Sequence, residues 1–476
     1  MSVIQALTDI LSPKNIIIDK GDMAPFLDDW RGNYSGAAAA ILLPVSTAQV
    51  SEIMALADAH DLYIVPQGGN TGLVGGGIPD QSGHMFVLSL ARMNKVRSIS
   101  PENRSMIVEA GCLLESLHNL ADEHDLHFPL NLAAKGSCSI GGNLSTNAGG
   151  INVLRYGNTR DLCLGLEVVL MGGKVMNLLT SLRKDNTGYD LKHLFIGGEG
   201  TLGIITAASM KLFPKPTARA TAIAAIPHPQ AGVELLAQVK KASGDIVEAF
   251  EIMPHDIFAI VEKQFPQLPC PLKPIPAFAI LMEIGSSDPE LAKPNDDGTS
   301  PITQKLEMIL ADAFETGHVL DAVIAQNETQ RTAMWDIREN APESTKREST
   351  PVNTDISVTL SDFSRFYELA SNNVKEIDPE VRICGYGHLG DGNVHFNVVE
   401  RLGGDASWAQ KRGAIFDAIY AALYECNGSI SAEHGIGAMK VDQLAALKDP
   451  VALATMKAIK TTLDPKGLLN PGKVLH

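Results

Sequence analysis

Two histidines that could bind a metal ion lie close together in the segment GYGHLGDGNVHFN, residues 385–397. His388 and His395 flank a Gly-Asp-Gly turn, which we expect to fold the chain back on itself. The segment VHFNV alternates like a β-strand, so the side chains of His395 and Asn397 are expected to project to the same face. Imidazole is a common ligand of zinc and other divalent ions, so both histidines are candidate ligands.

A glutamate and a further histidine follow in SAEHGIG. Glu433 and His434 stand among small residues, which let the backbone pack closely behind them. Two imidazoles and one carboxylate would form a divalent-ion site with positions open for a substrate, whereas a closed structural zinc site has four protein ligands. The alternative is that His388 and His395 are core histidines and Glu433 is a salt-bridged glutamate, because the spacing of the two histidines is not a standard metal motif. The Glu433-His434 pair favours a site.

Three glycine-rich blocks precede these segments: PQGGNTGLVGGG at 66–77, KGSCSIGGNLSTNAGG at 135–150 and GGEGTLG at 197–203. Loops that approach a phosphate closely need residues without Cβ and backbone N–H groups turned inward. The first block is neither a Walker loop nor a G-x-G-x-x-G helix start. One such loop alone fits a surface turn as well. Three blocks together favour a large cofactor with a ring system and a diphosphate.

The elements around the blocks predict an α/β domain. AAAILLP, from Ala38, has the pattern of a buried strand, Ser46 is a candidate N-cap of the helix that follows, and YIVPQGG has the pattern of a strand that runs into the first block. Another helix, LLESLHNLADEHDL, precedes the second block. Such a β-α-β opening is typical of a layered α/β architecture.

The composition changes near residue 215, where KLFPKPTARATAIAAIPHPQAG becomes rich in proline and alanine, and we place a domain boundary there. Further on, KRGAIFDAIYAALYECNG has the pattern of an amphipathic helix that stops at Gly428. The predicted parts are an N-terminal helical lead-in at 1–37, a glycine-rich domain at 38–215, a second domain at 216–429 and a C-terminal segment at 430–476.

Bulk properties exclude several classes of protein. The formal net charge is −16 and no run of Lys or Arg is present, so we expect no nucleic-acid partner. The six cysteines are widely spaced without a C-x-x-C, which predicts reduced thiols in a cytoplasmic protein. The N-terminus lacks a basic region followed by a long apolar run, so we expect no signal peptide. No uncharged apolar stretch approaches the roughly 18–20 residues that a membrane span needs.

The glycine blocks resemble the FAD-binding domain of the vanillyl-alcohol oxidase/PCMH flavoprotein superfamily over roughly residues 38–215. The matching motifs are PQGGNTGLVGG, AAKGSCSIGGNLSTNAGG and GGEGTLGIIT. The resemblance implies an α+β fold: a two-subdomain PCMH-type FAD-binding domain, an α/β substrate (cap) domain with an antiparallel sheet, and a C-terminal segment that returns to the flavin. The first block contains no His or Cys, the residues that carry covalent FAD in some relatives, so we predict non-covalent FAD.

The resemblance also assigns residues to the cofactor. It places the first block at the diphosphate and the second block at the flavin, and it adds residues of the third block and of the C-terminal segment. The predicted FAD-binding residues are Pro66, Gly68, Gly69, Asn70, Thr71, Gly72, Lys135, Gly136, Ser137, Ile140, Gly141, Gly142, Asn143, Thr146, Gly149, Gly150, Glu199, Gly200, Gly203, Ile204 and Asn470.

GHLGDGNVHFNV and SAEHGIG resemble the C-terminal domain of the flavin-linked D-lactate and D-2-hydroxyglutarate dehydrogenases. The resemblance implies that His388, His395 and Glu433 are the metal ligands, with zinc as the first choice of ion. It implies that His434 is the catalytic base and also binds the substrate, together with Asn397.

Arg338, in MWDIRENAPESTKRE, stands where family members place an arginine for the substrate carboxylate, and a guanidinium pairs bidentately with such a group. The alternative is a surface ion pair with a neighbouring acidic residue such as Asp336. Two positions depart from the hydroxyglutarate-type pattern. Pro342 replaces a hydroxyl residue and Asn353 replaces a lysine, which weakens the case for a distal carboxylate. The candidates to compensate are Ser344, Thr345, Lys346 and Arg347.

The resemblance as a whole implies an FAD-dependent dehydrogenase that oxidises a small D-2-hydroxy acid to the 2-oxo acid. The metal would lower the hydroxyl pKa, His434 would remove the proton and the C2 hydride would pass to flavin N5. D-2-hydroxyglutarate is the first choice of substrate, and D-lactate, D-malate or a non-redox alkyl transfer of the same superfamily are the alternatives. The expected partners are a second copy of the chain and an unidentified electron acceptor: oxygen, a quinone or a partner flavoprotein.

Overall fold

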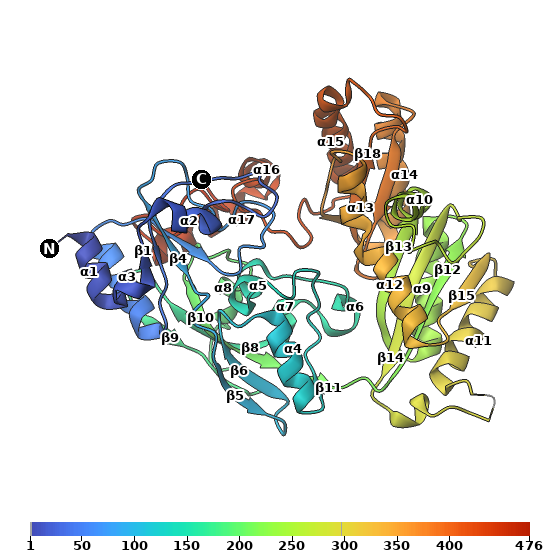
Figure 1. Cartoon of the computed structure of the whole chain (residues 1–476), viewed down its shortest axis with the longest axis horizontal. Helices are drawn as coiled ribbons and strands as arrows, with labels where there is room; N and C mark the ends of the chain where they lie inside the picture. The colour runs from blue at the N-terminus through green and yellow to red at the C-terminus, as the bar shows by residue number, and fades with distance from the viewer. Residues whose placement is uncertain (1, 297) are drawn as a thin grey trace. The chain divides into compact units, whose positions relative to one another are not determined.

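The computed structural model describes residues 2–296 and 298–476. The chain divides into two compact units, each built from segments that are far apart in the sequence (Figure 1). The first unit comprises Met1–Gly150, Gly157–Pro214 and Glu433–His476, and the second unit comprises Ile151–Tyr156 and Lys215–Ala432.

The lead-in is not wholly helical, which corrects the expectation for residues 1–37. It holds helices α1 (Val3–Leu11) and α2 (Lys20–Leu27), but strand β1 (Ile16–Ile17) lies between them and pairs antiparallel with β2 (Ala38–Leu42). Two consecutive β-branched residues favour the extended backbone there. The lead-in therefore completes the first sheet, and Leu7 and Leu11 of α1 lie in its core.

The first sheet of this unit has the order β1-β2-β4-β3, in which β4 (Met85–Ser89) pairs in parallel with both β2 and β3 (Ile64–Gln67). The connection from β2 to β3 contains α3 (Thr47–Ala59), as the β-α-β pattern predicts. The Ser46 hydroxyl accepts a hydrogen bond from the backbone N–H of Gln49, which confirms the predicted N-cap.

The second sheet of this unit is antiparallel, with the order β5-β6-β10-β8-β9. Its strands are β5 (Val96–Ser100), β6 (Ser105–Glu109), β10 (Ile204–Lys211), β8 (Cys163–Val169) and β9 (Val175–Asn177). A two-stranded pair joins β7 (Leu126–His127) to β11 (Phe213–Pro214). The remaining helices before the C-terminal part are α4 (Leu114–Glu123), α5 (Ile140–Thr146), α7 (Thr159–Leu162) and α8 (Lys192–Phe195).

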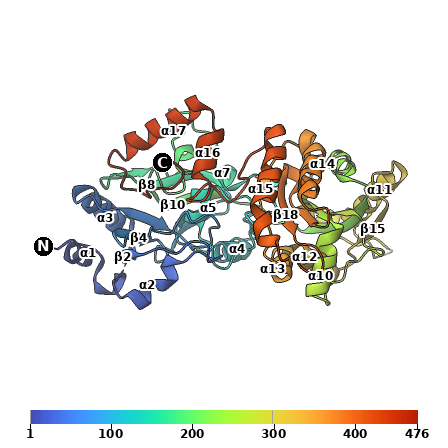
Figure 2. The same ribbon diagram turned by 90° about the horizontal axis from the view of Figure 1, so that it is seen from above.

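The C-terminal part of the chain returns to this unit and adds α16 (Val441–Leu447) and α17 (Pro450–Leu463), which both views draw beside its sheets (Figures 1 and 2). The Lys460 ammonium donates to the carbonyls of Thr201 and Leu469, at 2.8 and 2.7 Å. The Asn470 N–H donates to the Ile64 carbonyl at 2.7 Å. These bonds tie the last residues to β3 and to the third glycine block.

The second unit is built on an antiparallel sheet with the order β13-β14-β12-β15 and a smaller sheet with the order β16-β18-β17. Its strands are β12 (Ala218–Ile226), β13 (Val247–Pro254), β14 (Phe278–Ser286), β15 (Asp321–Ile324), β16 (Ile356–Ser357), β17 (Arg382–Tyr386) and β18 (Asn393–Val399). Its helices are α6 (Val153–Tyr156), α9 (Pro229–Ser243), α10 (His255–Gln264), α11 (Pro301–Glu315), α12 (Glu328–Glu339), α13 (Ala341–Glu348), α14 (Leu360–Ile377) and α15 (Trp408–Glu425).

A hydrophobic core joins one face of the larger sheet to α10 and α12, and includes Phe258 and Trp335. At Gly232 of α9, an added Cβ would lie 3.3 Å from Ile280 of β14, so this helix packs closely on the sheet. An isolated antiparallel bridge between Ile252 and Gly387 connects the smaller sheet to the larger one. That bridge sets β13 beside the segment that carries the first predicted metal ligand.

The end of α15 differs in detail from the sequence prediction. The helix ends at Glu425, and the left-handed residue after it is Asn427, with φ +50°. A Cβ at Gly428 would lie 2.2 Å from the Leu423 side chain and 2.7 Å from the Ser357 carbonyl. Gly428 is therefore needed for close packing beside β16, while asparagine supplies the left-handed turn.

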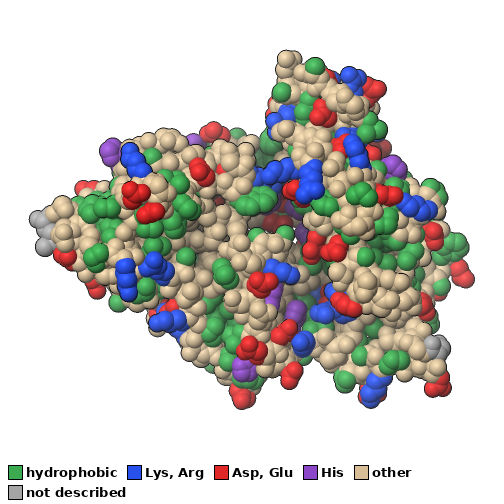
Figure 3. Space-filling view, in the orientation of Figure 1, with side chains coloured by type: hydrophobic (Ala, Val, Ile, Leu, Met, Phe, Trp, Pro, Cys, Tyr) green, Lys and Arg blue, Asp and Glu red, His purple; other side chains and the backbone are tan. Residues whose placement is uncertain are grey.

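All six cysteines are free and buried. No helix among the described residues combines the length and the apolar character that a membrane crossing requires. On the face drawn in Figure 3, Lys and Arg side chains are interspersed with Asp and Glu side chains.

Phe396 of β18 provides a test of this core. It is 0% exposed, and its ring meets those of Phe366 and Tyr367 edge to face, at centroid distances of 5.6 and 5.2 Å. We expect Phe396→Ala to lower the free energy of unfolding by about 3–5 kcal/mol, since it leaves a cavity. Phe314→Ala, at a side chain that is 60% exposed, should change it by less than about 0.5 kcal/mol. Urea unfolding followed by circular dichroism measures both, and equal effects would contradict the assignment.

Candidate active site

The first and second glycine blocks lie against each other in the first unit. A Cβ added at Gly68 would lie 2.5 Å from the Ser139 hydroxyl oxygen, and one at Gly69 would lie 2.0 Å from the Ser137 carbonyl oxygen. Real Cβ atoms do not approach so closely, so only glycine allows the two loops to meet. The Asn70 amide donates to the Asp28 carbonyl at 2.9 Å, which turns this side chain toward the lead-in.

The second block forms α5. The Ser139 hydroxyl accepts from the N–H of Gly142 at 3.4 Å and caps this short helix. A Cβ at Gly141 would lie 2.6 Å from the Cβ of Ala110, so the helix packs directly on the turn after β6. The Thr146 hydroxyl donates back to the Gly142 carbonyl at 3.2 Å. The block thus presents small side chains and backbone groups, as the cofactor prediction requires.

The third block joins the first block to the C-terminal segment. Glu199 has φ +48°, and its carboxylate accepts hydrogen bonds from the N–H groups of Ile436 and Gly437, both at 2.7 Å. Burial raises the pKa of the Glu199 carboxyl, and these two donors oppose that shift. A Cβ at Gly200 would lie 2.4 Å from the Pro66 ring. Glu199 therefore connects the third block to the C-terminal segment. This is a structural role in addition to its predicted contact with the cofactor.

Asn470 is the clearest sign of a missing partner in this unit. It is 1% exposed, and its amide donates to the carbonyls of Gly76 and Glu199 at 3.1 and 2.8 Å. Its Oδ1 is buried and has no hydrogen-bond partner among the described residues. A buried acceptor without a donor is costly, so a ligand that brings an N–H or O–H group fits here. The residues present therefore fit FAD.

Glu433 contacts the end of the second block. Its carboxylate accepts from the N–H of Gly150 at 2.5 Å, and Gly150 has φ +94°. Both residues belong to the first unit, as does His434.

Gly203, a predicted cofactor residue of the third block, packs against Val168, where an added Cβ would lie 2.7 Å from the valine Cγ1. That position is a packing site within the sheet as well as a predicted cofactor contact.

In the second unit, the structure brings the two predicted histidine ligands together. His388 follows β17 and His395 lies in β18, and their rings are 5.9 Å apart at an interplanar angle of 74°. Their potential ligand atoms lie within 4.8 Å of each other. Asn397 lies two residues after His395 in β18, and its side-chain oxygen accepts a hydrogen bond from the N–H of Thr354 at 3.1 Å. This geometry suits a shared ion between the imidazoles.

Sequence reasoning missed two buried carboxylates beside these histidines. Asp355 is 2% exposed, and its ligand atom lies within 4.8 Å of one on His395. Glu251 of β13 is 0% exposed and contacts His388 Nδ1 at 2.5 Å and Arg338 Nε at 2.6 Å. Burial alone would raise the pKa of the Glu251 carboxyl, but His388 and Arg338 lower it to about 2. The signal for Glu251 in the sequence was the presence of two glutamates inside an otherwise apolar strand, VEAFEIMP.

Arg338 is buried and pairs with a residue of β13, whereas the alternative for it was an ion pair on the surface. Its residue is 7% exposed, it pairs with Glu251, and its guanidinium carbon lies 4.9 Å from the centre of the Tyr386 ring. A buried arginine held by a carboxylate and an aromatic ring is typical of a binding site rather than of a solvated helix face.

The candidates to replace the missing lysine are mostly engaged elsewhere. The hydroxyls of Ser344 and Thr345 donate to backbone carbonyls of their own segment, and the Arg347 guanidinium pairs with Glu343 at 2.9 Å. Asn353 itself is exposed. The second unit thus supplies Arg338 as the cation for one substrate carboxylate, while three of the four candidates for a distal carboxylate have partners within their own segment.

Two family models match the chain. The model described as FAD binding domain matches residues 38–179, and the model described as FAD linked oxidases, C-terminal domain, matches residues 215–474. The mitochondrial D-2-hydroxyglutarate dehydrogenase of Arabidopsis thaliana is 39% identical over 469 residues, which covers 98% of this chain and 80% of the relative. The Bos taurus protein of the same name is 39% identical over 97% of this chain and 81% of its own.

Other matches are more distant. A D-2-hydroxyglutarate–pyruvate transhydrogenase of Saccharomyces cerevisiae is 35% identical over 95% of this chain and 90% of its own. Among solved structures, p-cresol methylhydroxylase with substrate bound has a TM-score of 0.75 at 15% identity, covering 99% of this chain and 96% of that one. Alkyldihydroxyacetonephosphate synthase has a TM-score of 0.72 at 17% identity, covering 98% and 84%. These structures confirm the predicted α+β fold.

Gly69→Ala tests the contact between the first two blocks. The added methyl group would collide with a backbone carbonyl, so we expect the loop to shift and FAD to bind roughly tenfold more weakly or worse. Gly413→Ala is the control, because nothing lies within 4 Å of a Cβ there in α15. Flavin fluorescence titration of the apoprotein measures both affinities. Wild-type affinity in Gly69→Ala would contradict the loop assignment.

Proposed function

The chain belongs to the family of FAD-linked oxidases that includes the D-2-hydroxyglutarate dehydrogenases, and on that basis we propose that it oxidises D-2-hydroxyglutarate to the corresponding 2-oxo acid. It is an FAD-dependent oxidoreductase that acts on a CH–OH donor. The observation that carries the substrate class is the buried Arg338, which shares one carboxylate with His388. A fixed cation beside candidate metal ligands suits an acid with a hydroxyl next to its carboxylate.

FAD, when bound, supplies the acceptor for the hydride that leaves C2 of the substrate. The three glycine blocks would hold it through backbone groups, and the buried Oδ1 of Asn470 would accept a hydrogen bond from it. We propose that the binding is non-covalent.

We propose that His388, His395 and Glu433 hold one divalent ion, with zinc as the first choice. Two imidazoles and a carboxylate match zinc's ligand preferences and leave a position open. Glu433 follows directly in sequence on Ala432, the last residue of the second unit, while the histidines belong to that unit. Such an ion would lower the pKa of the substrate hydroxyl.

The protein side chains would then divide the remaining work. His434 would accept the hydroxyl proton on an imidazole nitrogen, since a neutral imidazole is an effective base near pH 7. Arg338 would orient a substrate carboxylate through its guanidinium, and Asn397 would contact the bound acid. We also propose a cytoplasmic homodimer, on the family resemblance and the cysteine usage alone.

D-lactate and D-malate are the second candidates. Asn353 is exposed where hydroxyglutarate-type enzymes carry a lysine, and Ser344 and Thr345 spend their hydroxyls on backbone carbonyls. D-lactate has a single carboxylate and needs no second cation, whereas D-malate keeps a second carboxylate, one methylene group closer to the hydroxyl than in hydroxyglutarate. The electron acceptor is a partner flavoprotein, a quinone or oxygen, and the yeast relative, a transhydrogenase with pyruvate in its name, adds a 2-oxo acid to the acceptors worth assaying.

Anaerobic flavin bleaching tests the proposal directly. Purified protein should be yellow, and D-2-hydroxyglutarate should remove its long-wavelength absorbance while L-2-hydroxyglutarate leaves it unchanged. D-lactate and D-malate are tested in the same way. If either bleaches the flavin faster than D-2-hydroxyglutarate does, that acid becomes the proposed substrate. Absence of bleaching by every 2-hydroxy acid would overturn the redox function.

His434→Ala separates the base from the cofactor site. We expect the variant to retain FAD but to reduce it at least roughly 100-fold more slowly, because the hydroxyl proton loses its acceptor. His60→Ala, at an exposed histidine of the same unit, should reduce FAD at the wild-type rate. Anaerobic stopped-flow absorbance gives both rates. Normal reduction in His434→Ala would show that another group is the base.

A further inference from the structure

Glu251 occupies an unusual place in the second unit. It is a fully buried carboxylate in the middle of β13, and each of its oxygens contacts a different predicted site residue: Oε1 contacts His388 Nδ1 at 2.5 Å, and Oε2 accepts from Arg338 Nε at 2.6 Å. The bridge between Ile252 and Gly387 sets this register, since it places the residue before Ile252 next to the residue after Gly387. Gly387 has φ +144°, a conformation that favours glycine.

We propose that Glu251 is a positioning residue that orients the metal ligand His388 and the substrate-binding Arg338 together. The inference rests on the proposed function, because it takes the roles of these two residues from there. It goes beyond that function, because it assigns to one buried carboxylate the coupling of metal binding to substrate binding.

The contact with His388 fixes which ring nitrogen can bind an ion. When Nδ1–H donates to the carboxylate, the ring is neutral and Nε2 carries the lone pair. Metal-binding histidines usually donate their second nitrogen to such a partner, and loss of the partner typically weakens metal binding 10–100-fold. His395 lies with a ligand atom within 4.8 Å of one on His388, so a fixed ring keeps both imidazoles directed at one ion.

The contact with Arg338 fixes the plane of the guanidinium. Glu251 takes the Nε edge, and the Tyr386 ring lies 4.9 Å from the guanidinium carbon. One of the four N–H donors on the two Nη atoms points along the same edge as Nε–H, and the other three point along the remaining edges of the group. When the guanidinium is already oriented, the arginine side chain loses less entropy as a substrate carboxylate binds. The KM for the substrate therefore depends on the contact between Glu251 and Arg338.

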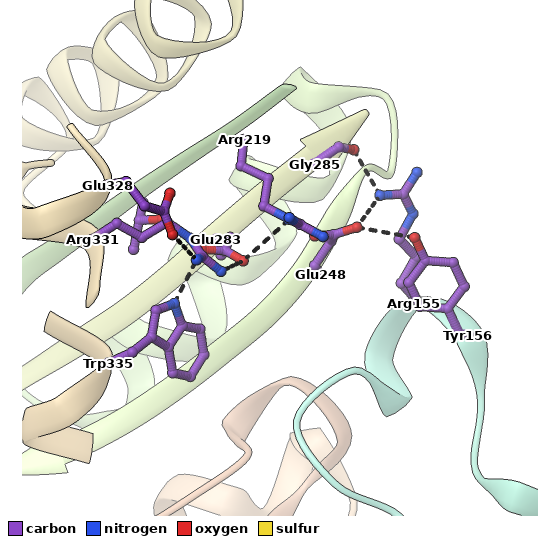
Figure 4. Close-up of polar contacts among 10 residues, drawn as sticks. Arg155, Tyr156, Arg219, Glu248, Glu283, Gly285, Glu328, Arg331 and Trp335 are labelled. Atoms are coloured by element: carbon purple, nitrogen blue, oxygen red, sulfur yellow. Dashed lines mark hydrogen bonds and ion pairs between the residues drawn. The ribbon is translucent and has the colours of Figure 1, made fainter. Parts of the chain in front are cut away.

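The same unit holds a matched carboxylate without contact to the predicted site. Glu283 of β14 is 4% exposed, and Arg331 Nε donates to it at 2.6 Å, the same distance as in the Glu251–Arg338 pair. Trp335 Nε1 and the Thr221 hydroxyl also donate to it, at 3.0 and 2.6 Å. Figure 4 shows this network, which continues through Arg219 to Glu248. Both arginines come from α12 and lie two turns apart. Glu283→Gln therefore places an amide in a similarly buried position and removes an ion pair with an arginine, as Glu251→Gln does.

The test compares Glu251→Gln with Glu283→Gln in the full-length FAD-loaded protein. Zinc affinity is measured by competition with a chromogenic chelator after metal removal, and KM for the best substrate is measured with an artificial acceptor. An amide cannot accept from both His388 and Arg338, so we expect Glu251→Gln to bind zinc roughly 10–100-fold more weakly and to raise KM. Glu283→Gln should lower the melting temperature by a similar amount and leave zinc affinity and KM within about twofold of wild type.

Each outcome decides the proposal. Wild-type zinc affinity and KM in a folded Glu251→Gln protein would overturn it, and so would equal weakening in Glu283→Gln, which would mean a general loss of stability. If Glu251→Gln does not fold, Glu251→Asp takes its place, because it keeps the charge and should give an intermediate zinc affinity. If the wild-type protein binds no zinc and keeps full activity after chelation, the proposed metal site fails, and the KM of Glu251→Gln alone then decides the role of Glu251.

Discussion

The structure of the second unit depends on the burial of carboxylates inside an antiparallel sheet. Glu251, Glu283 and Glu248 are each at most 4% exposed, although an unpaired charge in such a place would cost several kcal/mol. Each has an arginine and at least one further donor. Because removal of one partner leaves a buried charge, these groups specify how α12 and the smaller sheet dock on the larger one. The candidate active site uses the most buried member of the set.

The first unit depends on a different constraint, which is the close approach of backbone to backbone. A Cβ added at Gly69 or Gly200 would lie 2.0 or 2.4 Å from a neighbouring segment. The Glu199 carboxylate accepts hydrogen bonds from two N–H groups of the C-terminal segment and so connects that segment to the third block. The result is a cluster of loops rich in backbone donors. The buried Oδ1 of Asn470, which lacks a hydrogen-bond donor among the described residues, fits a ligand that brings one.

Local patterns were enough to predict what local physics decides. The helix cap at Ser46 and the histidine pair around a Gly-Asp-Gly turn depend on neighbours in sequence, and the structure has both. The family resemblance extended this to the cofactor and the fold. Glu251 was beyond reach, because its partners lie 87 and 137 residues away and only strand register brings them together. The strand at Ile16 was missed for a similar reason, since two residues become a strand only beside β2.

The division of the chain into interleaved units has a consequence for biosynthesis. The first unit needs Glu433–His476, whereas the second is complete once Ala432 has been made. During synthesis, the second unit therefore has all its residues while the first unit still lacks α16, α17 and Asn470, whose amide donates to the carbonyl of Gly76. We expect the second unit to reach its native packing first on the ribosome, and the cofactor loops to close only when the last segment emerges.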